Sequence, residues 1–378
     1  MRAVAAVNIA ELRAIAKRRL PRFVFDYVDG GAEDERTLAG NRDAFERLRF
    51  APRTLVDVAE RDLSCRLLGA PSALPVVVGP TGLNGLCWRD GDMALAKAAS
   101  MAGVPFAMST VSMSLVEDVA REAPGRLWLQ AYVFAERRIT EAILERALAA
   151  GFECAILTSD FPVAGKRERD LRSGLLPRQS FTAATKLDML MHPRWLATVA
   201  TRRPRFVNVE RELEPGRNVN AFVGHGMFDP SFDWDDVKRF RDRWPRKLLL
   251  KGVLRPDDAA RAAAAGFDGI VLSNHGGRQL DGAISGIEAL PAVAREVGGR
   301  VALLVDGGVR RGGDIAKAVA LGAEGVLLGR APVYGLAAGG REGATQALRI
   351  LADEFDRTLA LTGCTGVASL TPDLVVGA

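Results

Sequence analysis

The chain has 378 residues, of which 48% are hydrophobic and 26% are charged, so it can bury one large core or two ordinary ones and is not a disordered or fibrous polypeptide. Its 51 Lys and Arg residues against 46 Asp and Glu residues give a net charge of +5, a mild excess that argues against a nucleic-acid-binding protein. The four cysteines stand far apart without disulfide or metal-ligand spacing, which favours a reducing, cytoplasmic compartment and no metal site.

Residues 1–70 are expected to form a helical cap. Charged residues interrupt the apolar ones in MRAVAAVNIAELRAIAKRRL, which predicts an amphipathic helix and not the apolar core of a signal peptide. No segment approaches the roughly 18 uncharged apolar residues that a membrane span needs. We therefore do not expect an integral membrane protein, whereas contact with a membrane surface stays open.

From about residue 74 onward, short apolar runs alternate with stretches of helical periodicity. Runs that are apolar on both faces are typical of buried parallel strands. The eight runs are LPVVVG, VPFAMST, RLWLQAYV, CAILTSD, KLLLKGV, GIVLSNH, VALLVDGG and GVLLGR. Their number and spacing predict a (β/α)₈ TIM barrel over residues 71–365, within a single domain of residues 1–378. An open, doubly wound sheet is the structural alternative.

The segment between the fourth and fifth runs, residues 161–246, is far longer than an ordinary connection in such a barrel. We interpret residues 165–235 as a mobile loop, with a short helix near Trp234 that leads into the fifth strand. The arginines of this loop and Trp195 would permit contact with a membrane surface, but a solvated lid over the active site is the preferred interpretation.

Polar or reactive residues stand at or near the carboxyl ends of the runs. These residues are Thr81, Ser109, Tyr132, Asp160, Lys251, His275 and Asp306. In a barrel of this kind the carboxyl ends of the strands form one face, and that face carries the active site. The pattern therefore predicts that these side chains converge.

His275 follows the sixth run in SNHGGRQLDG, where two glycines let the backbone turn sharply and bring Arg278 toward the same face. Asp160 ends another strand there, and a carboxylate beside an imidazole stabilises the protonated imidazole. This arrangement favours His275 as a general base over a structural histidine. Arg278 and Arg167 suit an anionic substrate, because a guanidinium group binds a carboxylate through two parallel hydrogen bonds.

The sharpest local signal is the glycine-rich run VDGGVRRGGD, from Val305 to Asp314, followed by LLGR, from Leu327 to Arg330. Glycine-rich turns after the seventh and eighth strands of this fold often bind phosphate, since free backbone N–H groups point at the anion. Arg310 and Arg330 would add positive charge. We predict a phosphate site here, and tight turns without a ligand are the alternative.

These motifs resemble those of the FMN-dependent 2-hydroxy-acid dehydrogenase and oxidase family. The similarity covers nearly the whole chain and is carried by YVDGGAEDERTL, PTGLNGLCW, QAYV, LTSD followed by GKRERD, LLLKG, SNHGGRQLD, and DGGVRRGGD with LLGRA. Within the family, PTGLNG, HPRW and YGLAA are most similar to the (S)-mandelate dehydrogenases. The resemblance implies FMN as the cofactor and a homotetramer as the assembly.

The resemblance also implies a role for each matching residue. The residues implied in catalysis or substrate binding are His275, Asp160, Tyr132, Arg278, Tyr27 and Arg167. Of these, His275 would be the base and Asp160 would stabilise its protonated form, the two arginines would bind the substrate carboxylate, and the two tyrosines would contact the carboxylate or hydroxyl group. The residues implied in binding FMN are Pro80, Thr81, Gly82, Ser109, Gln130, Thr158, Lys251, Ser273, Asp306, Gly308, Arg310, Gly329 and Arg330.

Two of the FMN-binding residues have more specific implied positions. Lys251 would lie near the N1–C2 edge of the flavin, where a positive charge favours the anionic reduced form. Asp306 would bind the ribityl hydroxyl groups rather than the phosphate.

Two departures from the family pattern bear on the substrate. Short-chain members carry Trp where this chain has Val111, so there is room here for a larger substrate side chain. The fourth run reads LTSDFP where LTVD is more usual, so Ser159 and Phe161 are atypical, and we assign them no role beyond packing.

We therefore expect FMN-dependent oxidation of an (S)-2-hydroxy acid, with mandelate or another aromatic or bulky acid favoured. An oxidase of lactate or glycolate that makes hydrogen peroxide is the alternative. A flavin-binding protein without turnover is disfavoured by the complete set of catalytic residues. The α-hydrogen can leave as a proton or as a hydride to flavin N5, and His275 is the base in both cases.

The electron acceptor is left open by the sequence. No haem-attachment motif is present, so the acceptor is oxygen, a diffusible quinone or another protein. A dehydrogenase is expected over an oxidase on the resemblance alone. The expected location is the cytoplasm, with peripheral attachment to the inner face of the membrane as an option.

Overall fold

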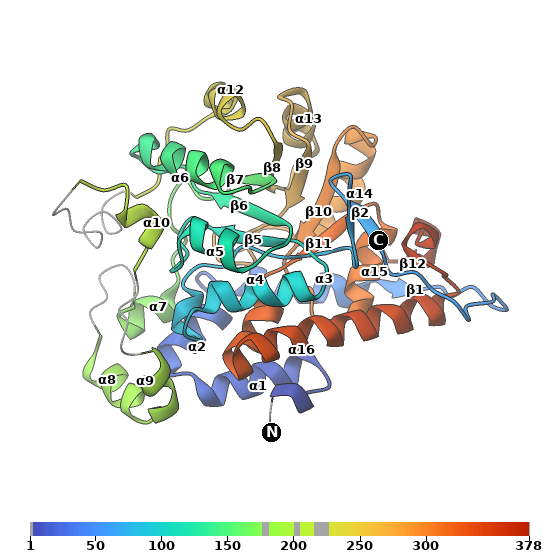
Figure 1. Cartoon of the computed structure of the whole chain (residues 1–378). Coiled ribbons are helices and arrows are strands. Elements are labelled where there is room, and N and C mark those ends of the chain that lie inside the picture. Colours follow the sequence, from blue (N-terminus) through green and yellow to red (C-terminus); the bar gives the residue numbers. More distant parts are fainter. Residues whose placement is uncertain (1–2, 176–180, 200–204, 215–226, 378) are drawn as a thin grey trace.

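Eight parallel strands close into a barrel in the computed structural model, which describes residues 3–175, 181–199, 205–214 and 227–377 (Figure 1). The strands are β4 (Val76–Val78), β5 (Phe106–Ser109), β6 (Leu127–Ala131), β7 (Cys154–Thr158), β8 (Lys247–Val253), β9 (Gly269–Leu272), β10 (Ala302–Asp306) and β11 (Gly325–Leu328). They follow chain order around the barrel, and β11 pairs with β4 to close it. Each strand lies in one of the eight apolar runs, so the predicted (β/α)₈ barrel is confirmed and the open sheet is wrong.

The interior of the barrel is filled by side chains. Trp128 and Leu249 are fully buried in this inner cluster. A hairpin of β2 (Cys65–Leu67) and β3 (Ala70–Ser72) adds Leu67 to the same cluster, beside the amino ends of the strands. Because the interior is packed, a ligand site is left to the carboxyl end of the barrel.

Helices surround the barrel and bury their apolar faces against the outside of the sheet (Figure 1). Those that follow barrel strands are α4 (Gly91–Met101), α5 (Val116–Glu122), α6 (Arg137–Ala149), α13 (Pro256–Ala264), α14 (Gly286–Val297), α15 (Gly312–Ala320) and α16 (Arg330–Thr362). Short 3-10 turns are η1 (Ala3–Ala5), η2 (Asn84–Leu86), η3 (Val367–Ser369) and η4 (Pro372–Leu374). Helix α16 is broken by non-helical backbone angles at Gly339 and Gly340.

The amino-terminal cap consists of α1 (Ile9–Arg19), α2 (Arg22–Asp29) and α3 (Arg36–Arg47). Helix α1 packs on α16, and α3 reaches the segment after β9, where the side-chain amides of Asn41 and Asn274 exchange two hydrogen bonds of 3.0 and 2.8 Å. After the cap helices, β1 (Arg49–Phe50) pairs antiparallel with β12 (Val375–Val376), close to the carboxyl terminus. The predicted helical cap is thus present, while the single-domain bounds stay a prediction.

The long segment after β7 carries several helices. They are α7 (Glu168–Ser173), α8 (Ala183–Leu190), α9 (Pro193–Val199), α10 (Val207–Glu210) and α12 (Trp234–Arg243), the last of which is the helix expected near Trp234. Residues 176–180, 200–204 and 215–226 of the predicted mobile loop lie outside the described residues.

The alternative that Trp195 contacts a membrane surface is not supported, because the side chain is buried. Its side chain is only 5% exposed, its indole N–H donates to the Leu86 carbonyl at 2.7 Å, and its ring lies 5.7 Å from that of Phe23. The tryptophan therefore attaches α9 to the barrel. None of the helices in the described part of the chain has the length and hydropathy that a transmembrane span requires.

Candidate active site

A cavity of about 250 Å³ lies at the carboxyl ends of the barrel strands. The predicted site residues that line it are Tyr27, Pro80, Thr81, Gly82, Ser109, Gln130, Tyr132, Thr158, Arg167, Lys251, His275, Arg278, Asp306, Gly308, Arg310, Gly329 and Arg330. The two that do not line it are Asp160 and Ser273, which instead contact lining residues. The structure thus brings the predicted residues together around one space.

His275 lies just beyond the buried strand β9, after Ser273 and Asn274. Its Nδ1 lies 2.9 Å from Asp160 Oδ1, and its Nε2 lies 3.1 Å from the Tyr132 hydroxyl. Its backbone N–H donates to Ser273 Oγ at 2.9 Å. Both ring nitrogens therefore have a fixed partner, which sets the orientation of the ring.

The backbone around His275 is unusual. His275 has φ of 58°, in the left-handed region that non-glycine residues rarely adopt. Gly277 continues the left-handed turn with φ of 74°, and a Cβ atom there would lie 2.6 Å from the backbone nitrogen of Leu38. The sharp turn expected from the glycines is present, and close approach of the cap makes glycine necessary at Gly277.

The charge states of the His275 and Asp160 pair follow from burial. Burial lowers the pKa of His275 below its usual value, although the Asp160 charge acts in the opposite direction. The imidazole is therefore neutral at neutral pH, the form that can accept a proton. Burial raises the pKa of Asp160, but the interactions with His275 and with the charged Lys251 outweigh burial and hold that pKa below its usual value. Asp160 is thus a carboxylate beside a neutral base.

Lys251, on β8, is the centre of a second polar cluster. Its ammonium group donates to Ser273 Oγ at 2.7 Å and lies 3.2 Å from Asp306 Oδ2. Burial lowers the pKa of Lys251, but the charges of Asp306 and Asp160 raise it above its usual value, so the side chain stays charged. Asp306 Oδ1 is buried and accepts no hydrogen bond from any described residue. This unused acceptor, beside the cavity, fits a ligand hydroxyl group.

Three polar side chains form a hydrogen-bonded row across adjacent strands. Ser109 Oγ donates to Gln130 Oε1 at 2.8 Å, and Gln130 Nε2 donates to Thr158 Oγ1 at 2.8 Å. The three residues end or nearly end β5, β6 and β7, and all of them line the cavity. The row gives one wall of the cavity fixed donors and acceptors along its length.

Arg278 and Arg167 line the cavity as well. The Arg278 guanidinium donates through Nη1 to the carbonyls of Tyr27, at 2.7 Å, and Gly30, at 3.0 Å. Arg167 Nε lies 3.6 Å from Asp170 Oδ2. Burial and the charge of Arg167 lower the pKa of Arg278, which means that an anion bound beside the pair would be stabilised.

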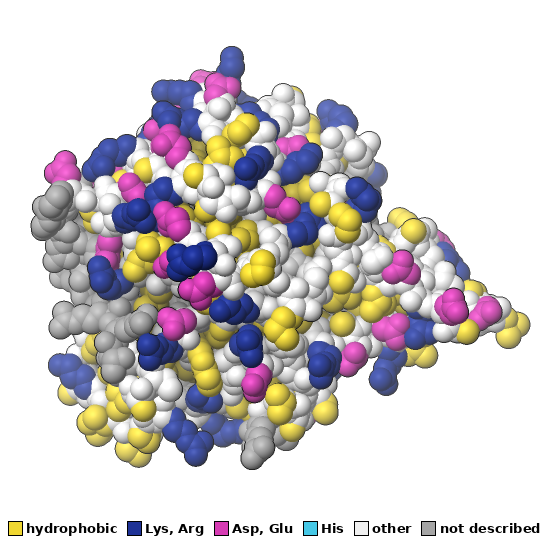
Figure 2. All heavy atoms as spheres, in the orientation of Figure 1, with side chains coloured by type: hydrophobic (Ala, Val, Ile, Leu, Met, Phe, Trp, Pro, Cys, Tyr) yellow, Lys and Arg dark blue, Asp and Glu magenta, His cyan; other side chains and the backbone are white. Residues whose placement is uncertain are grey.

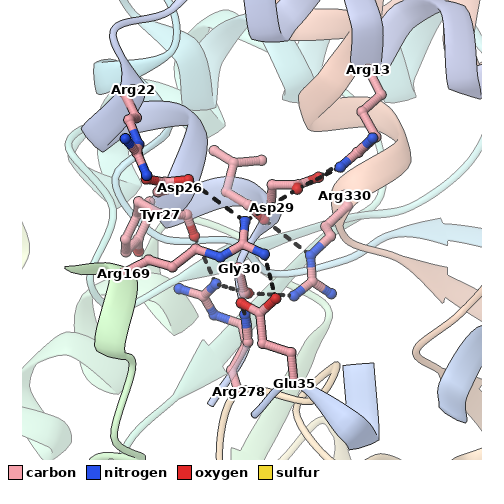
Figure 3. Close-up of polar contacts among 12 residues, drawn as sticks. Arg13, Arg22, Asp26, Tyr27, Asp29, Gly30, Glu35, Arg169, Arg278 and Arg330 are labelled. Atoms are coloured by element: carbon pink, nitrogen blue, oxygen red, sulfur yellow. Dashed lines mark hydrogen bonds and ion pairs between the residues drawn. The ribbon is translucent and has the colours of Figure 1, made fainter. Parts of the chain in front are cut away.

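The carboxyl end of α2 holds this corner of the site in place (Figure 3). Besides accepting from Arg278, the Gly30 carbonyl accepts from Arg330 Nη2 at 2.8 Å, and the Val28 carbonyl accepts from Arg330 Nε at 3.0 Å. Asp29, in the same turn, binds Arg13 at 2.6 Å. Carbonyl groups at the end of a helix carry partial negative charge, so they suit guanidinium groups.

The glycine-rich turn after β10 also borders the cavity. Gly308 has φ of 89°, and a Cβ atom there would lie 2.1 Å from the Asn41 carbonyl oxygen. Burial lowers the pKa of Arg310 and lowers that of Arg330 to about 10. Helix α16 begins at Arg330, so its unpaired N–H groups lie beside these two cations. The buried Arg310 guanidinium group and the N–H groups at this helix end fit a phosphate group.

The apolar side of the cavity was missed by sequence reasoning. Phe206, Met227 and Phe228 line it together with Phe161, and the first three come from the long segment after β7. The Phe161 ring centroid lies 4.5 Å from that of Phe228 and 5.2 Å from that of His275. No motif or periodicity in the sequence marks these residues as part of a site. The one hint of an apolar wall was Phe161, which departs from the family pattern.

The closed barrel, the buried histidine, the polar row and the glycine-rich turn at the carboxyl ends of the strands suit a barrel enzyme that binds an anionic cofactor. Residues 16–377 match the family described as FMN-dependent dehydrogenase. The chain belongs to this family, and FMN is its cofactor. The resemblance stated from the sequence is therefore confirmed.

Individual relatives cover nearly the whole chain. The chain is 46% identical to (S)-mandelate dehydrogenase of Pseudomonas putida, over 97% of this chain and 93% of that protein. It is 44% identical to L-lactate dehydrogenase of Caulobacter vibrioides, over 97% of each. It superposes with a TM-score of 0.94 on a crystal structure of the monotopic membrane protein (S)-mandelate dehydrogenase, at 44% identity over 99% of this chain and all of that one. A mandelate oxidase mutant with (S)-mandelic acid gives a TM-score of 0.82, at 35% identity over 98% of each chain.

Proposed function

We propose that the protein oxidises an aromatic (S)-2-hydroxy acid such as mandelate to the 2-keto acid. The observation that carries this proposal is the composition of one cavity, in which a neutral buried histidine, two guanidinium groups and an aromatic wall meet. A base, a carboxylate site and an apolar surface are what such a substrate requires. The similarity to enzymes named for mandelate and for lactate supports the 2-hydroxy-acid class.

In the proposed mechanism, His275 takes a proton from the substrate through Nε2, because Nδ1 is held by Asp160. The Asp160 carboxylate stabilises the imidazolium that results. When bound, FMN accepts the two electrons that the substrate loses. The same base serves whether the α-hydrogen leaves as a proton or as a hydride.

The substrate would be held by groups on both sides of the base. Arg278 and Arg167 bind the carboxylate, and Tyr27 and Tyr132 contact the carboxylate or hydroxyl group. Tyr132 can reach the same atoms as the base because its hydroxyl lies 3.1 Å from His275 Nε2. Orientation by these groups places the substrate hydroxyl within hydrogen-bond reach of the imidazole.

The proposed FMN site runs from the polar row to the phosphate corner. The flavin would be held by the backbone at Pro80, Thr81 and Gly82 and by the row of Ser109, Gln130 and Thr158. Lys251 would stabilise the negative charge of the reduced flavin, and Asp306 would bind the ribityl hydroxyl groups. Gly308, Arg310, Gly329 and the backbone N–H of Arg330 bind the phosphate, since the Arg330 guanidinium donates to three backbone carbonyls. Ser273 acts through Lys251, whose ammonium group it positions.

Replacing Arg310 with leucine should weaken FMN binding by about 10- to 100-fold and leave riboflavin binding unchanged, because one charge-assisted contact to the phosphate is lost. Fluorescence titration of the cofactor-free chain with each flavin measures both affinities. Arg311→Leu is the matched control, since the Arg311 side chain is exposed and pairs with Glu354 outside the cavity. If Arg310→Leu weakened the binding of FMN and of riboflavin equally, Arg310 would not bind the phosphate.

Anaerobic mixing with 2-hydroxy acids of increasing size, from glycolate through (S)-lactate to (S)-mandelate, tests the function itself. We expect mandelate to bleach the flavin fastest and the colour to return slowly in air. Bleaching by lactate or glycolate with immediate recovery would identify a short-chain oxidase instead. If no 2-hydroxy acid bleaches the flavin, the protein binds FMN without this turnover.

We further propose that the electron acceptor is a quinone or a protein rather than oxygen, reached by peripheral contact with the inner membrane face. Leu187, Leu190 and Met191 are exposed on and after α8, and Arg194 follows on α9. Figure 2 shows hydrophobic and basic side chains gathered on this part of the surface. Apolar side chains rimmed by cations suit an anionic lipid surface.

Flotation of the protein with anionic vesicles measures this contact, and Leu190→Asp should reduce it. Equal flotation of both proteins, or none of the unmodified protein, would remove the support for a membrane-bound acceptor.

The homotetramer implied by the family resemblance stays a prediction that the molar mass in solution would test.

A further inference from the structure

We propose that Phe161 is the residue that selects an aromatic substrate side chain, and that Phe228 is the positioning residue that keeps its ring in place. This inference rests on the proposed function and assigns a role to residues that no sequence motif marks. It separates two properties of the cavity, the volume that admits a large substituent and the surface that prefers an aromatic one.

Phe161 lies in the cavity wall beside the proposed base. It directly follows Asp160, lines the cavity and is 9% exposed. Its ring centroid lies 5.2 Å from that of His275 and 4.9 Å from that of Tyr132, so it contacts both polar groups proposed to face the reacting carbon. A substrate hydroxyl within hydrogen-bond reach of His275 Nε2 brings the substituent on the same carbon to the Phe161 ring.

The end of the long segment fixes Phe228. Phe228 forms an isolated antiparallel bridge with Phe134, flanked by hydrogen bonds of 3.0 Å from Ala135 N to Met227 O and from Asp229 N to Val133 O. The bridge lies just beyond the carboxyl end of β6. An irregular segment that comes from far away in the chain is thereby attached directly to the barrel.

The bridge places the Phe228 ring in the wall of the cavity. Its centroid lies 4.5 Å from that of Phe161 and 5.1 Å from that of Tyr132, with interplanar angles of 65° and 60°. Asp229, the next residue, binds Arg137 at 2.7 Å and so holds the bridge from its outer side. Inclined ring pairs at these distances are favourable aromatic contacts, so Phe228 restricts the Phe161 ring.

Val111 does not supply the same selectivity. It lines the cavity but is aliphatic, so it admits a large substituent without distinguishing an aromatic ring from a saturated one of similar size. An aromatic pair is worth about 3- to 10-fold in an equilibrium beyond the area that it buries. Phe161 is a lining residue next to the base whose aromatic ring carries no polar group, so it can make this distinction.

The test compares three acids in anaerobic flavin reduction: (S)-mandelate, (S)-hexahydromandelate, which has a saturated ring, and (S)-lactate. The unmodified holoenzyme should prefer mandelate over hexahydromandelate. Phe161→Leu should lower that ratio of kcat/KM about 5-fold and the mandelate-to-lactate ratio about 10- to 100-fold, since leucine keeps an apolar side chain and loses the ring. Phe161→Met, whose flexible unbranched side chain adapts to irregular gaps, answers the same question if the leucine variant does not fold.

Two further variants separate selection from structure. Phe228→Leu should lower the same ratios by a smaller factor, mainly through KM for the aromatic acid, because the Phe161 ring then loses one restraint. Phe232→Leu is the matched control, since Phe232 belongs to the same segment but does not line the cavity. Its ratios should equal those of the unmodified enzyme.

The outcomes distinguish this inference from the proposed function. Equal loss of activity toward all three acids in Phe161→Leu overturns the selective role of Phe161 and leaves the proposed oxidation intact. Reduction of the unmodified enzyme by lactate alone overturns both the inference and the aromatic substrate. Absence of reduction by any of the acids overturns the proposed function, and this inference falls with it.

Discussion

A His275→Asn variant should bind FMN normally and reduce it with mandelate about 10²- to 10⁴-fold more slowly, the usual contribution of a general base. Asparagine is the suitable replacement because His275 has φ of 58°, and Asn adopts this left-handed region more readily than Ala does. The variant thus removes the base without adding backbone strain. Stopped-flow bleaching under anaerobic conditions gives the rate, and the bound flavin spectrum gives the occupancy.

His192→Asn is the matched control for this experiment. His192 lies outside the cavity, and its Nδ1 is 2.8 Å from the Asp188 carbonyl oxygen. We expect its flavin reduction to equal that of the unmodified enzyme. Reduction of His275→Asn at nearly the original rate would show that another group takes the proton.

The pH dependence of reduction should reflect the buried state of the base. Because burial lowers the pKa of His275, the rate should rise with pH through a midpoint below 6.5 and then level off, as the protonated imidazole cannot accept a proton. Asp160 raises that pKa, so Asp160→Asn should move the midpoint to lower pH and also reduce the plateau rate. An unchanged midpoint in this variant would contradict the assigned coupling.

Arg278→Leu should lower kcat/KM for mandelate by about 30- to 5,000-fold, because removal of one partner of a buried charge pair typically costs 2–5 kcal/mol. Arg278→Lys should recover only part of this loss, since an ammonium group keeps the charge and lacks the planar pair of donors that matches a carboxylate. Steady-state kinetics with an artificial acceptor measures both variants. An unchanged kcat/KM in Arg278→Leu would remove this residue from the substrate site.

Arg169→Leu controls for the structural share of the Arg278 effect. Arg169 pairs with Asp29 at 3.6 Å and with Glu35, so it supports the same end of α2, but it does not line the cavity. If loss of support for α2 explains the Arg278→Leu phenotype, Arg169→Leu should reproduce it. We expect a much smaller fall in kcat/KM and a comparable fall in thermal stability.

The strand-end residues were predictable because their convergence follows from the chain order of a parallel barrel. Once eight apolar runs are placed side by side, His275, Asp160 and Lys251 must share one face. The turn at Gly277 was equally predictable, because its two glycines permit a backbone conformation that few other residues adopt.

Other features depend on contacts that local sequence does not encode. Phe206 and Phe228 reach the cavity only because the segment after β7 folds back on β6. The sequence shows that Arg330 stands beside a phosphate turn, but it does not reveal that α2 supplies carbonyl acceptors for its guanidinium group. The burial of Trp195 could not be predicted for the same reason, since it depends on Leu86 and Phe23.

Backbone carbonyls at the carboxyl end of α2 bind Arg278 and Arg330, so docking of the cap and order in the cofactor site depend on each other. If α2 detached from the barrel, two buried guanidinium groups would lose their carbonyl acceptors, at a cost of about 1–3 kcal/mol for each group left unsatisfied. Amide hydrogen exchange in the amino-terminal helices should therefore slow when FMN is bound, because the cofactor stabilises only the docked state. A barrel expressed without residues 1–50 would lose its flavin along with its cap.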